Sequence, residues 1–507
     1  MSKPLVVFIT PREDNDCFNL VSFDLSTRKE VPCCTKEVND LLKFFDKPPE
    51  FITNVKGIVC NIYGFCKNGT IDHEFCSKLA SKLKNFKIPF RFMSNLHITA
   101  MCTFIAAKVD PKIDKEVLQI HIQDEIFKLC SFSRAEEGYV MTEVREIRKN
   151  YHPDVLLGQS NPTKIIIVNA NAFLPVSAKV KTLQLYLFEW NPIVVHRNTS
   201  NFLFDAVKEL VDHMFNVEGS KKYFVIPQTL DKFGVSVNGK DPSDNDILVK
   251  IKGNEYLPAA EACVVSRFHE KFYITGKSKT KNVILQGPIE ITKECHRIKL
   301  TLSVDLNNYP TLNHEAVIFS KISKMPKKLK TEKTDKLPII GFFDNASVIC
   351  LWNEAENCYK FMDSWNGKFG KDLFIDFLLP KPTIVASSTD VTSLAGAVYD
   401  LIKIMSMPSN AIRIDDTWKF TFTEDDENPV LLEFDTFEKS RKQASPAFLM
   451  AMMLKEHIRA IKKETGKKPT KLGFRLLDEF VNSEARKRVE NGLEEACGMI
   501  KTGFLLV

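Results

Sequence analysis

Residues 445–499 read SPAFLMAMMLKEHIRAIKKETGKKPTKLGFRLLDEFVNSEARKRVENGLEEACGM, and this segment predicts a helix, a strand and a second helix in turn. Ser445 is a preferred N-cap and Pro446 suits the first helical position, whereas Gly466 and the later Pro469 end the helix. One face of this helix carries Met450, Met453, Leu454, His457, Ile458 and Ile461. Residues 472–477 follow as a strand and residues 483–499 as a helix, which indicates a sheet covered by helices.

The same alternation recurs upstream, whereas the middle of the chain has a different pattern. Residues 55–62 and 90–93 are strand-like, and a helical stretch follows each of them. Between residues 224 and 318, short apolar stretches alternate with turn signals, which predicts a β-sandwich. Residues 321–336 contain seven lysines and no aromatic residue. We expect a solvated linker there, because a nucleic-acid-binding arm would need arginine or aromatic residues.

Composition places the 507-residue chain among globular proteins, since 44% of its residues are hydrophobic and 26% are charged. The net charge of +6 is too mild to predict a nucleic-acid partner, and no stretch predicts a membrane helix or a signal peptide. We therefore expect a cytoplasmic protein. The 13 cysteines form no Cys-x-x-Cys pair, and Cys60, Cys66, His73 and Cys76 lack the spacing of a zinc site. No metal site is expected.

Glycine is scarce, with 20 residues in 507, whereas a share of about 7% is usual. Glycine allows the backbone to approach a phosphate closely and to adopt positive φ. Few positions in this chain can therefore form a glycine-rich loop that binds the phosphates of a nucleotide.

The segment 445–488 resembles the seventy-kilodalton heat-shock chaperone family. That family has a helix opening with Pro-Glu where this chain has Ser445-Pro446, and it has Asn-Asp-Ser-Gln-Arg where this chain has Asn482-Ser483. A short Gly-Lys connection, at residues 466–471 here, links the helix to the strand. Residues 382–408 look like the family's stretch from its Thr-Pro-Ser strand to its Asn-Pro turn. Order and spacing carry this resemblance more than identity does.

Residues 1–318 are similar to the same template. Residues 55–108 match a strand-helix-strand-helix region, residues 165–175 match the strand that leads into the family's Gly-Gly-Ser loop, and residues 224–235 match the opening of its peptide-binding sandwich. The resemblance implies α/β lobes of the actin-like ATPase type flanking an all-β domain. Four segments follow from it: 1–220 as the degenerate later part of an ATPase domain, 221–320 as the sandwich, 321–337 as a lysine-rich linker, and 338–507 as the first part of a second ATPase domain.

The family binds ATP between two lobes, and the resemblance locates the loops that would hold it. Four residues are candidates for the first phosphate loop: Gly341, Asp344, Asn345 and Ser347. The glycine and threonines that should follow the aspartate are absent, the second loop near Gln123 has no glycine, and Asn-Ala-Asn at 169–171 replaces Gly-Gly-Ser. Two interpretations of Asp344 therefore stay open: a carboxylate associated with magnesium, or an ordinary aspartate in a turn. Asp124 and Glu125 are weak candidates for catalytic acids, because their loop lacks the glycine that close approach to a phosphate needs. No catalytic residue is assigned, no cofactor is certain, and ATP and Mg²⁺ stay open.

The sandwich is the preferred candidate for binding, because edge strands bind extended peptides by strand addition. Phe268, Phe272 and Tyr273 are its candidate peptide anchors, and sandwich core is the alternative for all three.

The leading hypothesis is a chaperone-like protein that binds client polypeptides, with co-chaperones as further partners and with ATP use weakened or lost. An active ATP-dependent chaperone with divergent phosphate loops is the first alternative. A fragmentary reading frame without a stable fold is the second. The sequence leaves the client, the oligomeric state and the full length of the protein open.

Overall fold

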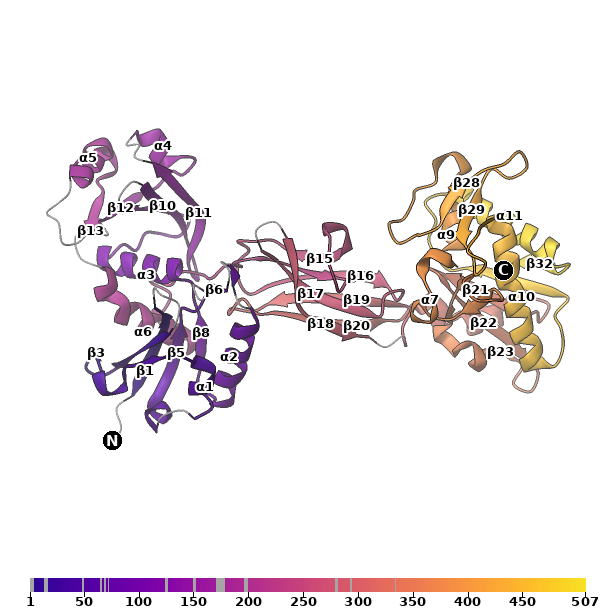
Figure 1. Ribbon diagram of the computed structural model, residues 1–507, viewed down its shortest axis with the longest axis horizontal. Helices are drawn as coiled ribbons and strands as arrows, with labels where there is room; N and C mark the ends of the chain where they lie inside the picture. The colour runs from indigo at the N-terminus through magenta and orange to yellow at the C-terminus, as the bar shows by residue number, and fades with distance from the viewer. Residues whose placement is uncertain are drawn as a thin grey trace.

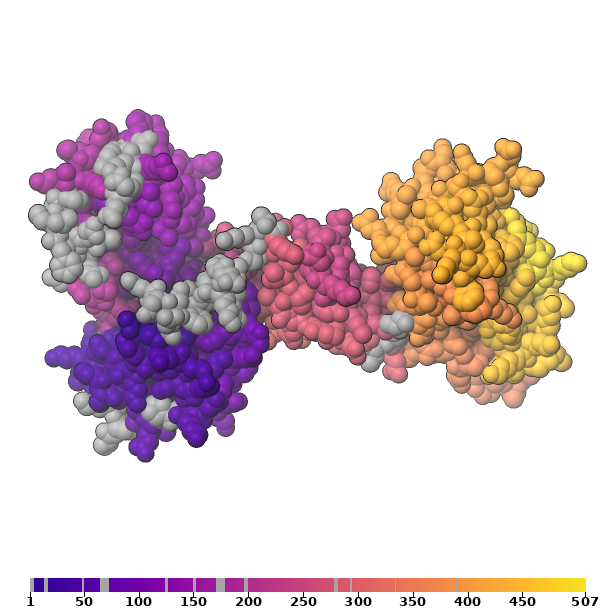
Figure 2. Space-filling model, in the orientation of Figure 1, coloured from indigo at the N-terminus to yellow at the C-terminus, as the bar shows by residue number. Residues whose placement is uncertain are grey.

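The computed structural model describes most of the chain as a mixed α/β protein with several β-sheets (Figure 1). The described residues are 4–12, 17–47, 50–63, 66–67, 70–71, 73–123, 126–148, 152–169, 178–195, 199–278, 281–291, 294–332 and 334–507. A sandwich of strands lies between an N-terminal and a C-terminal α/β body, and Figure 2 shows it as the narrow middle part. Among the described residues, no helix combines the length and the apolarity that spanning a bilayer requires.

The N-terminal body contains two sheets that share one hydrophobic core. The first has the order β3-β2-β1-β5-β8, with β4 paired to β2. Its elements are β1 (Leu5–Pro11), β2 (Phe18–Asp24), β3 (Lys29–Glu30), β4 (Lys36–Val38), α1 (Leu41–Phe44), β5 (Val55–Cys60), the hairpin β6 (Cys66–Lys67) and β7 (Thr70–Ile71), α2 (His73–Asn85), β8 (Phe90–Phe92) and α3 (Asn95–Ala107). Strands β1, β2 and β3 pair antiparallel and form one side of this sheet.

The second sheet has the order β11-β10-β9-β12-β13. Its elements are β9 (Glu116–Ile122), β10 (Ile126–Ala135), β11 (Gly138–Arg148), α4 (Pro153–Leu157), β12 (Lys164–Asn169), α5 (Ala178–Tyr186), β13 (Ile193–Val195) and α6 (Leu203–Met214). Helices α3 and α6 pack together, and their buried side chains join residues of both sheets in a single cluster. Gly57 of β5 permits this close packing, because a Cβ there would lie 2.9 Å from Val211 of α6.

The sandwich consists of two antiparallel sheets, β15-β14-β17-β18 and β16-β19-β20. Its strands are β14 (Lys232–Ser236), β15 (Ile247–Ile251), β16 (Ala259–Ser266), β17 (Lys271–Ser278), β18 (Lys281–Glu290), β19 (Arg297–Val304) and β20 (Pro310–Val317). Every second side chain of β19 is buried, as the period of two in a strand requires, and these residues share one core with β14, β15 and β17. These strands confirm the all-β region expected for residues 224–318.

The C-terminal body is built around a third sheet, β23-β22-β21-β31-β32, with β24 paired to β22. The elements of this sheet and its helices are α7 (Ser320–Ser323), α8 (Met325–Leu329), β21 (Ile339–Phe343), β22 (Ala346–Asn353), β23 (Cys358–Phe361), β24 (Lys371–Asp372), α9 (Leu401–Ser406), α10 (Pro446–Thr465), β31 (Lys471–Leu476), α11 (Ser483–Met499) and β32 (Gly503–Leu506). Two small sheets complete the body, β26-β25-β27 and β28-β29-β30. Their strands are β25 (Phe374–Asp376), β26 (Thr383–Val385), β27 (Ala397–Val398), β28 (Thr421–Thr423), β29 (Leu431–Asp435) and β30 (Arg441–Ala444).

The three large sheets share one strand order. In each, three antiparallel strands are followed across the sheet by two parallel ones: β1 pairs with β5 and β5 with β8, β9 with β12 and β12 with β13, β21 with β31 and β31 with β32. Parallel strands need crossover connections, and helices supply them in each sheet. The chain therefore repeats one α/β arrangement three times.

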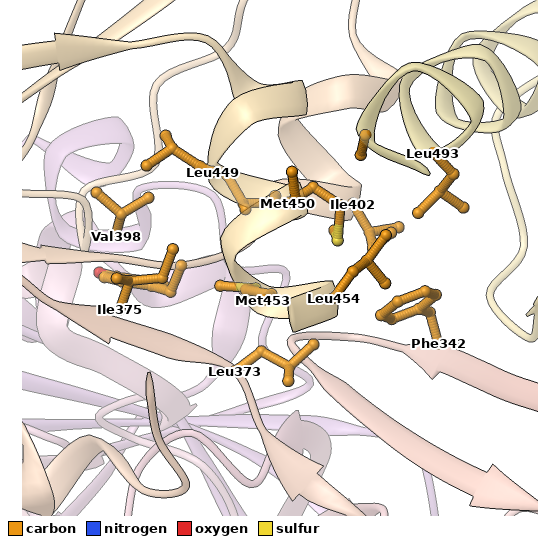
Figure 3. Close-up of a cluster of buried hydrophobic side chains, with 14 of the residues drawn as sticks. Phe342, Leu373, Ile375, Val398, Ile402, Leu449, Met450, Met453, Leu454 and Leu493 are labelled. Carbon is orange, nitrogen blue, oxygen red and sulfur yellow. The ribbon is translucent and has the colours of Figure 1, made fainter. Parts of the chain in front are cut away.

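Helix α10 confirms the helix expected between Ser445 and Gly466. Ser445 Oγ accepts a hydrogen bond from the Phe448 amide at 3.3 Å, and Gly466 ends the helix with a φ of 74°. All six residues expected on one face are buried. Met450, Met453 and Leu454 lie among side chains of β21, β25, β27, α9 and α11 (Figure 3).

The expectation of a solvated linker at residues 321–336 is wrong. This segment contains α7 and α8, whose Ile322, Met325 and Leu329 are at most 1% exposed. They pack on Ile339 and Val348 of the third sheet. The lysines around them are exposed where their side chains are described, so high charge density coexists with a continuous apolar stripe at helical spacing.

Candidate functional site

The turn between β21 and β22 stands where the resemblance places the first phosphate loop, and it contains only Asp344 and Asn345. Phe343 and Ala346 are paired directly on either side of it. The Asp344 amide already donates a hydrogen bond to Asp478 Oδ2 at 2.7 Å. A phosphate-binding loop wraps its ligand with several free backbone amides, and a two-residue turn offers too few for that.

Asp344 is held by an arginine of the sandwich. Arg297 Nε and Nη2 donate to the two carboxylate oxygens of Asp344 at 2.9 and 2.6 Å, in the bidentate geometry typical of strong arginine–carboxylate pairs. Asp344 in turn raises the pKa of the Arg297 guanidinium. The carboxylate considered for magnesium is therefore already neutralised by a cation.

Asn345 fixes the start of helix α9. Its Oδ1 accepts from the amide of Asp400 at 2.8 Å, and its backbone oxygen accepts from Leu373 at 2.9 Å. Asp400 has a left-handed φ of 58°, which is strained for a residue other than glycine. Trp418 Nε1 donates to its carboxylate at 2.9 Å, and burial nevertheless raises the pKa of Asp400. The turn thus places a second, half-buried carboxylate near the first.

Gly341 and Ser347, the other two candidates for a phosphate loop, lie away from the turn. Gly341 is buried within β21, where a Cβ would meet Leu477 at 2.9 Å, so close packing explains this glycine. Ser347 is buried, and its hydroxyl bonds His457 Nε2 at 2.8 Å. His457 Nδ1 must donate to the Met453 carbonyl at 2.8 Å, so Nε2 accepts from Ser347, and burial lowers the pKa of His457 to about 4. Ser347 belongs to the core.

The three aromatic residues considered as peptide anchors lie in different surroundings. Phe272 is 0% exposed in the sandwich core, so it is unavailable to a peptide, and the core alternative holds for it. Tyr273 is half-buried, and its ring covers Gly239 and Gly287. Phe268 packs against the C-terminal body, with its ring 5.2 Å from that of Tyr399.

A cleft of about 1010 Å³ opens between the sandwich and the C-terminal body, and it unites Phe268, Asp344 and Asn345. Its walls also include Arg297, Asp400 and Asp478. These residues come from segments up to 210 positions apart (268 to 478), so local sequence patterns carry no signal for the cleft. It is the candidate functional site.

Part of the expected nucleotide machinery falls outside the described residues. This holds for Asp124, Glu125 and residues 170–171, whereas Asn169 is buried at the end of β12. Within the described part of the chain, histidine, cysteine and acidic side chains form no group of three that could hold a metal ion.

Comparisons with models of protein families and with curated proteins found no match to this chain.

Asp478 makes the stability of the C-terminal body dependent on pH. Burial and the nearby Asp344 carboxylate raise the pKa of Asp478 to about 6, against an unfolded value of about 3.9. Folding then favours the protonated form, so stability falls as pH rises from about 4 to about 6, by roughly 3 kcal/mol at most. We expect Asp478→Asn, which keeps the acceptor for the Asp344 amide, to be more stable than the wild type at pH 7.5 and equally stable at pH 4.

Denaturant unfolding of both proteins at the two pH values measures this difference. Asp426→Asn, at an exposed carboxylate of the β28–β29 connection, is the control and should change neither value. A stability difference between Asp478→Asn and the wild type that is the same at both pH values would contradict the prediction.

Proposed function

We propose that this protein is a chaperone-like, polypeptide-binding protein of the seventy-kilodalton heat-shock type, with ATP binding and hydrolysis weakened or lost. The observation that carries the proposal is the two-residue turn at Asp344-Asn345, whose carboxylate is bound by Arg297 of the sandwich. The turn lacks the glycine and amides of a phosphate loop, and Arg297 of the sandwich already binds the carboxylate that would associate with magnesium.

The repeated sheet order supports the actin-like part of this proposal. Three antiparallel strands and two parallel strands recur in all three large sheets, and two of these sheets share a core through α3 and α6, as two lobes of one domain would. The tandem arrangement of this proposal has a two-lobe unit at residues 1–220, the sandwich at 221–320 and the first part of a second unit at 338–507. Cytoplasmic location and co-chaperone partners belong to the same proposal.

The sandwich supports the polypeptide-binding part. Strands β15 and β18 end one of its sheets, and β16 and β20 end the other. Most side chains of β20 are exposed. The edge of such a sheet presents backbone donors and acceptors that can pair with an extended segment of another chain.

Titration calorimetry of the full chain with magnesium-ATP tests the nucleotide part. We expect binding weaker than about 1 mM and no hydrolysis above the buffer rate, because neither a glycine loop nor a free Asp344 is present at the turn. Asp344→Asn should then leave both values unchanged. Tight magnesium-ATP binding with steady hydrolysis that Asp344→Asn lowers would establish the alternative, an active ATP-dependent chaperone.

A further inference from the structure

The cleft between the sandwich and the C-terminal body is negatively charged. Five carboxylates line it: Asp344, Asp400, Asp415, Asp478 and Glu479. Three cations face them: Arg297, Lys321 and Lys403. His269 adds no charge at neutral pH, because burial lowers its pKa to about 4. The cleft therefore repels a polyphosphate and attracts a cation.

The three cations are already paired. Arg297 binds Asp344, Lys403 Nζ lies 2.6 Å from Asp415 Oδ2, and Lys321 Nζ lies 3.1 Å from Glu479 Oε1. Two half-buried carboxylates remain, Asp400 and Asp478, and among the described residues neither forms an ion pair. Each accepts one neutral hydrogen bond, from Trp418 and from the Asp344 amide respectively.

An unpaired carboxylate that is partly removed from water is costly, and an incoming cation relieves that cost. Burial raises the pKa of both groups, in agreement with this electrostatic strain. Asp344 contributes to both shifts, so both carboxylates lie near the Arg297–Asp344 pair.

Most of the uncharged lining is apolar. Phe268, Ile402 and Phe480 contribute side chains to the wall, and Val481 at the rim is 98% exposed. The volume of about 1010 Å³ reaches the upper end of the roughly 300–1,000 Å³ that small-molecule pockets occupy. A small cation would leave the apolar wall uncovered, whereas an extended segment with alternating basic and apolar side chains matches both parts of the lining.

We propose that the cleft binds a basic, apolar polypeptide segment, with lysine or arginine side chains on Asp400 and Asp478 and aliphatic or aromatic side chains against Phe268, Ile402 and Phe480. This inference rests on the proposed polypeptide-binding function and names a site and a substrate class for it. The cleft touches the edge strands β15 and β16 through Leu248 and Val265, but it would bind a segment through side chains, whereas a sheet edge binds through backbone pairing.

Fluorescence anisotropy with the full-length chain tests the proposal. The probe is a fluorescein-labelled nine-residue peptide of alternating lysine and leucine, and the comparison peptide alternates glutamate and leucine. We expect the lysine peptide to bind at least about tenfold more tightly, a difference of about 1.4 kcal/mol. Asp400→Asn combined with Asp478→Asn should weaken its binding by about tenfold or more, because both substitutions keep the neutral hydrogen bonds and remove only the charge.

Two further variants keep the test decisive. Ser406→Lys adds a cation to the cleft wall without removing a carboxylate and should also weaken binding, whereas Asp426→Asn, outside the cleft, should not. A benzophenone-labelled form of the lysine peptide should crosslink to residues 477–481, as mass spectrometry would detect. Circular dichroism verifies that each variant is folded.

The outcomes separate this inference from the function on which it rests. Peptide binding that the cleft variants leave unchanged, or crosslinks confined to β18 and β20, the sandwich edge strands outside the cleft, would overturn the cleft assignment and leave the proposed function standing. Displacement of the peptide by magnesium-ATP would identify the cleft as a nucleotide site and overturn both. Equal binding of the two peptides would overturn the charge argument, and absence of any peptide binding would overturn the polypeptide-binding function itself.

Discussion

Replacing Arg267 by methionine is expected to destabilise the contact between the sandwich and the C-terminal body by about 3–5 kcal/mol. Arg267 Nε donates to Asp372 Oδ1 at 2.8 Å, and the two side chains are 4% and 6% exposed. The arginine is in the sandwich and the aspartate is in the C-terminal body. Removing the cation takes this ion pair away from a buried carboxylate, which is the costly way to break such a pair.

The same guanidinium also satisfies backbone carbonyls on both sides of the contact. Nη1 donates to Cys295 O at 2.9 Å and to Phe369 O at 2.6 Å, and Nη2 donates to Gly370 O at 3.3 Å. A buried acceptor left without a donor costs about 1–3 kcal/mol. We therefore expect Arg267→Met combined with Asp372→Leu to recover only part of the lost stability, since the second change restores charge balance but does not replace the arginine's hydrogen bonds to these carbonyls.

Denaturant unfolding gives the energies, and small-angle X-ray scattering detects separation of the two parts as a larger radius of gyration. Lys299→Met is the matched control, because the Lys299–Glu315 pair of the same sandwich is exposed and should contribute less than about 1 kcal/mol. If Arg267→Met cost no more than Lys299→Met, the contact would not depend on the buried pair. Full recovery in the double variant would show that the carbonyl bonds are unimportant.

Local signals in the sequence predicted the parts of the fold that local physics determines. The N-cap at Ser445, the stop at Gly466 and the apolar face of the helix between them are all confirmed. The helix at residues 483–499 also has the expected limits, with Asn482 as its N-cap. The expected α/β regions and the expected all-β region between residues 224 and 318 likewise correspond to sheets of the structure.

The lysine-rich segment shows how a correct observation led to a wrong interpretation. The lysines are exposed as expected where they are described, but Ile322, Met325 and Leu329 recur at intervals of three and four residues. That period is the signal of a buried helical stripe, and the density of charge concealed it.

The cleft could not be predicted from the sequence for a different reason. Arg267 and Arg297 resemble any arginine at a strand end, and their partners Asp372 and Asp344 are 105 and 47 residues away. The Arg267–Asp372 and Arg297–Asp344 ion pairs form only because the sandwich packs against the C-terminal body. The doubt about a phosphate loop at Asp344 could be raised from the sequence, because a missing glycine is a local property, and it stays a prediction.

Phe342→Ala is expected to destabilise the C-terminal body by about 3–5 kcal/mol. Phe342 is 1% exposed in β21, and its ring lies 6.0 Å from that of His457 on α10 and 6.2 Å from that of Phe474 on β31. Figure 3 shows it facing Leu454 of the same helix. Truncation removes the ring that packs between the sheet and helix α10. It leaves a cavity that cannot close easily, because the neighbouring side chains belong to β31 and α10 and are fixed by those elements.

The effect should also reach the cleft, because Phe342 is two residues before Asp344 and its carbonyl accepts from the Leu477 amide at 2.9 Å. Phe342→Leu fills part of the space and should cost less than Phe342→Ala. Phe448→Ala on the same helix α10 is the matched control, since Phe448 is 50% exposed and should change stability by no more than about 0.5 kcal/mol. Denaturant unfolding of the three variants gives the comparison. Equal stability losses for Phe342→Ala and Phe448→Ala would mean that helix α10 does not pack on the third sheet through Phe342. Packing of that helix would then not be what holds the Asp344-Asn345 turn beside the cleft.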